Sequence, residues 1–202
     1  MLREIIPMFI LAFLLITISA YADTGGSKTN ISAPDGHRPW KESGLSVGYG
    51  VDSIPEGKYE AILLIWHLAY DLEAYLPILK NHRGILVAVC EPQVNPVVQP
   101  ETEVEFGVGI GLKYLYPLTD RIYPYLQGTT GPHYISVRTE DQHRGFLFAN
   151  TIAAGLYYFL SERTAINVNY RFRHMSNAGL KRPNGGIDTH SGVVGISFFF
   201  GH

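Results

Sequence analysis

The stretch VEFGVGIGLKYLY, residues 104–116, indicates the fold class most clearly, because its large apolar side chains occupy alternate positions. One face would carry Val104, Phe106, Val108, Ile110, Leu112, Tyr114 and Tyr116. The other face would carry Glu105, Gly107, Gly109, Gly111, Lys113 and Leu115. An extended strand separates these two sets, whereas a helix would mix them. The strand is 13 residues long, against ~5–6 in a typical globular protein. A strand that crosses a bilayer needs ~9–11 residues.

Similar alternation recurs along the chain, so the sequence predicts eight strands. They lie near 44–52, 59–72, 84–91, 103–116, 121–137, 144–159, 163–177 and 187–200. The links PLTD and LSER, at 117–120 and 160–163, are short turns. The more polar or Pro/Gly-rich links are 53–58, 92–102, 138–143 and 177–187. Longer and shorter links tend to alternate, as in outer-membrane barrels, although 73–83 is longer than that pattern expects.

The predicted fold class is all-β, an eight-stranded antiparallel transmembrane β-barrel. Closure pairs every backbone group and removes sheet edges, which a bilayer requires. One predicted strand carries polar residues on a single face, and a membrane barrel would bury that face in its polar interior. These residues are Asn167, Asn169, Arg171 and Arg173. A soluble lipocalin-type barrel would turn the same face to water, and alternation alone does not separate the two. Strand length and aromatic content favour the membrane barrel.

Composition agrees with one domain that is poor in charge. The chain has 202 residues, of which 17% are charged, against about 25% in soluble proteins. The net charge of −2 gives no indication of a nucleic-acid partner. Cys90 is the single cysteine, so no internal disulfide can form.

The first 22 residues have the features of a secretory signal peptide. Arg3 precedes an apolar run that ends in Ala20-Tyr21-Ala22, a small-x-small cleavage site before Asp23. The alternative is an uncleaved anchor, although the run is short for a spanning helix, which needs about 20 apolar residues. We therefore expect a signal peptide over 1–22, a loose leader over 23–43 and the barrel over 44–202. The expected location is the outer membrane of a Gram-negative cell, as a multi-pass protein.

The stretch YRFRHMSNAGLKRPNGGID, residues 170–188, holds the candidate chemistry. His174 and Ser176 continue the apolar face of their strand, and Asp188 lies on the upstream extension of the apolar face of the last strand. In a membrane barrel this face meets lipid. The sequence therefore predicts that an imidazole, a hydroxyl and a carboxylate meet at the outer edge of one hairpin.

These residue types suit ester cleavage by acyl transfer to Ser176. A Ser hydroxyl needs a base within reach, and same-face neighbours on a strand are only ~6.6 Å apart. Asp188 on the adjacent strand can hold the other nitrogen of His174. Asn177 and the backbone near Gly179 can donate hydrogen bonds to an oxyanion. Two alternatives stay open: an ordinary interfacial loop, and a metal site of His174, Asp188 and His190 that lacks a fourth ligand.

The segment HMSNAGLKRPNGGID resembles the signature of the outer-membrane lipid A 3-O-deacylases (PagL-type). The family pattern is His-x-Ser-Asn-Ala-Gly, a Pro-Asn turn and an acidic residue. It matches His174 to Gly179, Pro183-Asn184 and Asp188, and the family usually has Glu at the last position. The resemblance implies an eight-stranded barrel that removes an ester-linked acyl chain from lipid A. It also implies Ser176 as nucleophile, His174 as base, Asp188 as acidic partner, and Asn177 with Gly179 as oxyanion hole.

The implied partners are lipid A, as part of lipopolysaccharide, and the outer membrane itself. No metal, cofactor or nucleic acid is expected, and a homodimer is left open. With both termini periplasmic, His174 and Ser176 fall at the outer end of their strand, near the outer leaflet. The alternative functions are a non-enzymatic small outer-membrane barrel, structural or adhesive, and a secreted soluble barrel that binds a hydrophobic ligand.

Overall fold

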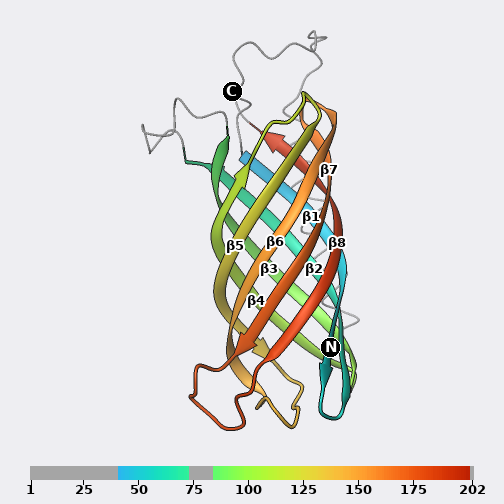
Figure 1. Ribbon diagram of the computed structural model, residues 1–202, viewed down its shortest axis with the longest axis vertical. Coiled ribbons are helices and arrows are strands. Elements are labelled where there is room, and N and C mark those ends of the chain that lie inside the picture. The colour runs from blue at the N-terminus through green and yellow to red at the C-terminus, as the bar shows by residue number, and fades with distance from the viewer. Residues whose placement is uncertain (1–40, 73–83, 201–202) are drawn as a thin grey trace. The chain divides into compact units, whose positions relative to one another are not determined.

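The computed structural model describes residues 41–72 and 84–200, which form a closed antiparallel barrel (Figure 1). Each strand pairs with the next in sequence, and the last returns to pair with the first. The strands are β1 (Lys41–Ile54), β2 (Gly57–Asp71), β3 (Ile85–Gln99), β4 (Glu103–Leu115), β5 (Ile122–Ile135), β6 (Gly145–Ser161), β7 (Thr164–Ser176) and β8 (Ile187–Phe200). The predicted fold class is confirmed. No helix within these two ranges is long and apolar enough to cross a membrane.

The outer wall of the barrel is apolar, whereas the interior buries many polar and charged side chains beside two clusters of apolar ones. On β7, Asn167 and Arg171 are buried in the interior, whereas Val168 and Tyr170 are 49% and 53% exposed on the outer wall. Asn169 and Arg173 are buried with the first pair, as expected for a membrane barrel. A soluble barrel would have the reverse arrangement, so the lipocalin-type alternative is wrong. An apolar outer wall around a polar interior is the arrangement of an outer-membrane barrel.

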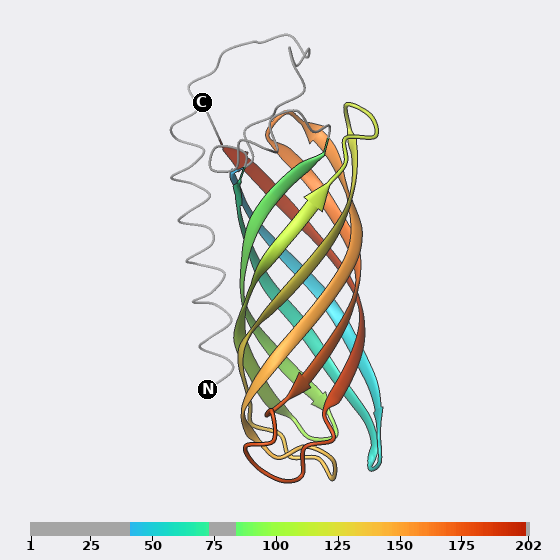
Figure 2. The ribbon, with the colours of Figure 1, turned by 60° about the vertical axis from the view of Figure 1, so that its left-hand side comes forward.

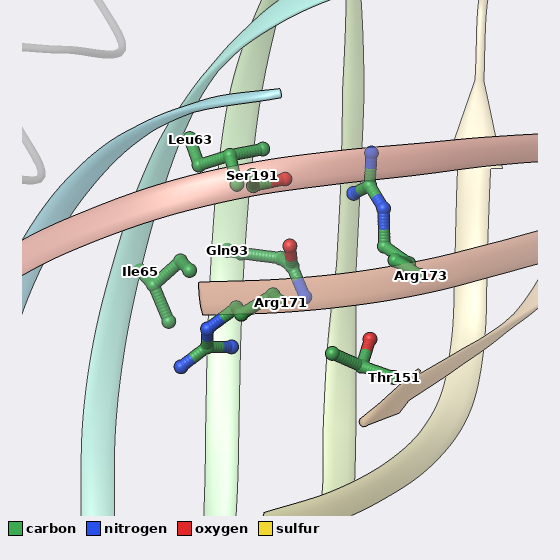
Figure 3. A pocket seen from close by; sticks show the side chains of 7 residues that line it. All are labelled: Leu63, Ile65, Gln93, Thr151, Arg171, Arg173 and Ser191. Carbon is green, nitrogen blue, oxygen red and sulfur yellow. The ribbon is translucent and has the colours of Figure 1, made fainter. Parts of the chain in front are cut away.

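Buried ion pairs cross the interior and join strands that are not neighbours. The Arg171 guanidinium on β7 binds the Glu91 carboxylate on β3 through two contacts of 2.7 and 2.9 Å. Arg173 contacts Glu105 of β4 at 2.6 Å. A small cavity lies beside the two arginines (Figure 3); it is lined by Leu63, Ile65, Gln93, Thr151, Arg171, Arg173 and Ser191. These pairs brace opposite walls against each other.

The predicted end of β3 is wrong. The segment 92–102 was expected to be a link because it contains Pro92 and Pro96, but β3 continues to Gln99. Pairing with β4 is unbroken across both prolines. Pairing with β2 has no matched position at either proline: one gap lies between Leu68↔Cys90 and Ile65↔Gln93, and a second lies between Ile65↔Gln93 and Ala61↔Val97. The missing proline N–H groups therefore face β2, where the ladder is interrupted.

A side chain replaces part of the interrupted ladder. The Leu64 N–H of β2 donates to Oδ1 of Asn95 at 3.0 Å, and Asn95 is fully buried. This bond supplies an acceptor for a backbone donor that would otherwise be unpaired in the wall. The strand therefore accommodates two prolines because an interior amide compensates for lost pairing.

The links at one end of the barrel are 55–56, 100–102, 136–144 and 177–186, and we call this end the loop end. It lies at the bottom of Figures 1 and 2. The links 55–56 and 100–102 are much shorter than the expected 53–58 and 92–102. The predicted alternation of long and short links therefore holds only in part. At the start of the barrel, β1 begins at Lys41, ahead of the expected Gly44, and Glu42 already points inward. The expected signal peptide and nearly all of the expected leader lie outside the described residues.

Candidate active site

The last hairpin brings His174 and Asp188 together on the outer wall. His174 is on β7, near its end, and Asp188 is the second residue of β8. The antiparallel register sets the two residues directly opposite each other. Both side chains project from the barrel, on the face that carries Tyr170 and Val168 further down β7. The candidate site therefore lies outside the barrel at the loop end, separate from the interior ion pairs.

The imidazole and the carboxylate form a close contact. Nδ1 of His174 lies 2.5 Å from Oδ1 of Asp188, and the two side chains are 39% and 52% exposed. An Asp, one methylene shorter than Glu, reaches the ring because residues directly opposite in an antiparallel pair have closely spaced Cα atoms, ~4.5–5.5 Å apart. With Nδ1–H donated to the carboxylate, Nε2 is left as the acceptor that a general base needs.

Ser176 continues the same face of β7 and is half-buried, opposite Phe148 of β6. Among the described residues, no hydrogen bond joins the Ser176 hydroxyl to His174. The structure thus brings together two of the three predicted triad members and leaves the third as their neighbour on the same face. In unliganded enzymes the bond from nucleophile to base is often long, and it tightens when substrate binds.

A glycine supports the imidazole from the loop side. Gly186 has φ of +91°, and a Cβ built on it would lie 2.7 Å from Cε1 of His174. A side chain at this position would have to displace the ring. The backbone therefore passes directly beside the ring, and only glycine allows both this approach and this φ. Gly186 restricts where the His174 ring can lie.

The loop 177–186 is held by Asn177 and Asn184. The Asn177 N–H donates to Oδ1 of Asn184 at 2.7 Å, and its Nδ2 donates to the carbonyl of Lys181 at 2.8 Å. Asn177 is buried, and Gly179 has φ of +81°. The backbone N–H of Asn177 and one N–H of its Nδ2 are therefore directed within the loop, and the Gly179 N–H has no partner among the described residues.

A second loop braces the first. The His143 N–H donates to the Pro183 carbonyl at 3.0 Å, and the Gly185 N–H donates to the Asp141 carbonyl at 2.6 Å. Figure 2 shows loops 136–144 and 177–186 side by side at the loop end. These contacts were not predicted, because they join segments whose pairing depends on loop conformation. Both loops are rich in polar, turn-forming residues, and this composition is the sequence feature that indicates loops ordered by hydrogen bonds.

Two further residues lie beside the pair. The Asp52 carboxylate of β1 accepts the Asp188 N–H at 2.8 Å and so holds the start of β8. His190, the third member of the alternative metal site, lies with Nδ1 2.5 Å from the Tyr170 hydroxyl. Its ring also packs against Phe172 at 5.2 Å. His190 is thus engaged by aromatic side chains of β7.

The fold and the site together define an outer-membrane β-barrel that carries an acid–imidazole pair on its outer wall. Residues 62–197 match the family described as lipid A 3-O-deacylase (PagL), and the chain belongs to this family. A search of curated protein sequences gave no match.

Two solved structures share the fold. The outer membrane enzyme PagL matches with a TM-score of 0.54 and 21% identity, covering 76% of this chain and 97% of its own. Neisserial surface protein A matches with a TM-score of 0.54 and 10% identity, covering 79% and 97%. An enzyme and a surface protein thus match with the same TM-score, so the barrel alone does not assign an activity. Neither comparison supports a homodimer.

Proposed function

We propose that this protein hydrolyses an ester-linked acyl chain of lipid A, with Ser176 as nucleophile, His174 as general base and Asp188 as its acidic partner. The observation that carries the proposal is the contact between His174 and Asp188 on the outer wall of a chain that belongs to the deacylase family. An interior site would be inaccessible to a lipid, whereas a site on this wall is open to the bilayer.

The reaction follows from the atoms of the hairpin. Nε2 of His174 accepts the Ser176 proton as Oγ attacks the ester carbonyl, and Asp188 stabilises the imidazolium that forms. The tetrahedral intermediate collapses, the sugar hydroxyl leaves with the proton from His174, and the acyl chain stays on Ser176. Water, activated by the same imidazole, then releases the fatty acid and restores the hydroxyl.

The position of the hairpin agrees with this substrate. With the start of β1 and the end of β8 on the periplasmic side, the loop end faces outward, and His174 and Ser176 would lie at the level of the outer leaflet. Lipid A occupies that leaflet, so its ester bonds approach the wall from the side. Apolar residues of β6 and β7 between the site and the middle of the barrel would contact the acyl chains; they include Ile152, Phe172 and Tyr170.

Asp188 provides a matched pair of variants. Asp188→Asn removes the charge that orients the imidazole, and we expect deacylation to fall by about 10⁴-fold. Asp188→Glu keeps the charge and matches the residue that is usual in the family, so most of the activity should remain. Lipid A from outer membranes that contain each variant is analysed by mass spectrometry for loss of one acyl chain.

The unaltered chain and an empty vector complete this experiment. We expect lipid A to lose one acyl chain when the unaltered chain is present and to lose none with the empty vector. If the unaltered chain is folded in the outer membrane and lipid A keeps all its acyl chains, the protein is a non-enzymatic barrel, structural or adhesive.

A further inference from the structure

A second polar pair lies on the outer wall beside the candidate triad. Oγ1 of Thr130 on β5 donates to Oδ1 of Asn150 on β6 at 2.7 Å, and both residues are exposed. In the register of the sheet, Thr130 lies opposite Asn150, Asn150 opposite His174, and His174 opposite Asp188. Four adjacent strands therefore present four polar side chains in one row across the outer wall.

The surroundings of this pair are apolar. Ile110 lies opposite Thr130 on β4 and is 58% exposed, and Ile152, the next outward residue after Asn150 on β6, is 68% exposed. On the other side along β6, the outward neighbour of Asn150 is Phe148. A polar amide on a wall that faces lipid costs free energy and indicates a function.

The hydrogen bond to Thr130 fixes the amide of Asn150. Because Oδ1 accepts the Thr130 hydroxyl, Nδ2 is the atom of the amide that stays available to donate to a ligand, and His174 lies opposite Asn150 on β7. Among the described residues, Nδ2 of Asn150 has no hydrogen-bond partner. Side chains directly opposite in a sheet have Cβ atoms ~4.5–5.5 Å apart, and diagonal neighbours are ~7–8 Å apart. An ester bound at Ser176, the diagonal neighbour, and at His174 is thus within reach of the Asn150 side chain.

We propose that Asn150 is a catalytic residue whose Nδ2–H donates to the carbonyl oxygen of the scissile ester as Ser176 attacks, and that Thr130 positions it. This assignment rests on the proposed function. The oxygen gains negative charge in the tetrahedral intermediate, and the amide stabilises it without transferring a proton. Asn177, the side chain expected in this role, uses its N–H and its Nδ2 to hold the loop. Asn150 supplies a donor that the loop does not occupy.

The test is Asn150→Leu in the purified full chain, assayed on lipid A in detergent micelles. Leucine has a similar volume, lacks the donor and is favourable on a wall that faces lipid, so the barrel should fold. We expect kcat to fall by about 10²–10³-fold, the effect of losing one oxyanion donor, with KM nearly unchanged. Thr130→Val should lower kcat by about fivefold, the effect of one lost neutral hydrogen bond, and Thr130→Ser should restore it.

The control is Tyr49→Phe, which removes an exposed hydrogen bond of 2.6 Å to Glu60 on the β1–β2 part of the wall. It should leave both constants unchanged. A rise in KM at constant kcat for Asn150→Leu would overturn the assignment and make Asn150 a headgroup contact. Unchanged kinetics would also overturn it. Ser176→Ala in the same assay separates the two proposals: if it is inactive while Asn150→Leu is fully active, only the role of Asn150 fails. If Ser176→Ala is active, both fail.

Discussion

Replacing Ser176 with alanine is expected to lower kcat on lipid A by on the order of 10⁶, the effect of removing the nucleophile from a serine hydrolase triad. His174→Gln should have an equally large effect, because the two residues act as one unit. The double variant should then be no worse than either single variant. The measurement is the rate of fatty acid release by purified protein in detergent micelles.

Both side chains lie on the outer wall, so neither substitution should affect the fold. Ser176 is half-buried and His174 is 39% exposed at the end of β7. Retention of the folded barrel is checked by its mobility on unheated gels. Additive losses in the double variant, or substantial activity in Ser176→Ala, would contradict the assignment of these two residues to one triad.

The second large effect concerns stability. Glu91→Gln should destabilise the barrel by about 3–5 kcal/mol, because it leaves the Arg171 guanidinium buried without its counter-charge. Arg171 is 3% exposed, and its two contacts to Glu91 are the bidentate link between β3 and β7. The double variant Glu91→Gln with Arg171→Met removes both charges and should recover much of the loss.

Urea unfolding of the barrel in lipid vesicles measures this effect. Tyr49→Phe is again the control, since an exposed hydrogen bond contributes about 1 kcal/mol or less. If Glu91→Gln unfolds at the same urea concentration as the unaltered protein, the pair of Glu91 and Arg171 does not brace the walls of the barrel.

Period-two alternation predicted all eight strands because lipid outside and a polar interior impose opposite chemistry on successive residues. The prediction failed where another interaction replaced the usual one. Pro92 and Pro96 indicate a loop in isolation, but the buried Asn95 amide compensates for part of the ladder that they interrupt. Glu42 looks like part of a polar leader, although it faces inward, 3.4 Å from Lys113 of β4. Such partners come from distant strands, and alternation does not show them.

The candidate site was predictable to a similar extent. The alternation along β7 and β8 placed His174, Ser176 and Asp188 on the outward face. Antiparallel pairing of these two strands sets His174 opposite Asp188. The engagement of Asn177 with Asn184 was not predictable, since it depends on the path of the loop. Thr130 and Asn150 are polar residues at outward positions, but their position beside His174 follows only from the register of two strand pairs, β5 with β6 and β6 with β7.

The proposal that Ser176 is the nucleophile is tested most directly by identifying the residue that carries the acyl chain during turnover. Purified protein is mixed with a long-chain p-nitrophenyl ester, quenched in acid within the burst phase and digested for peptide mass spectrometry. We expect an acyl adduct on Ser176 that appears with the burst and is absent in Ser176→Ala. An adduct on another residue, or product release with no adduct at any time, would contradict it.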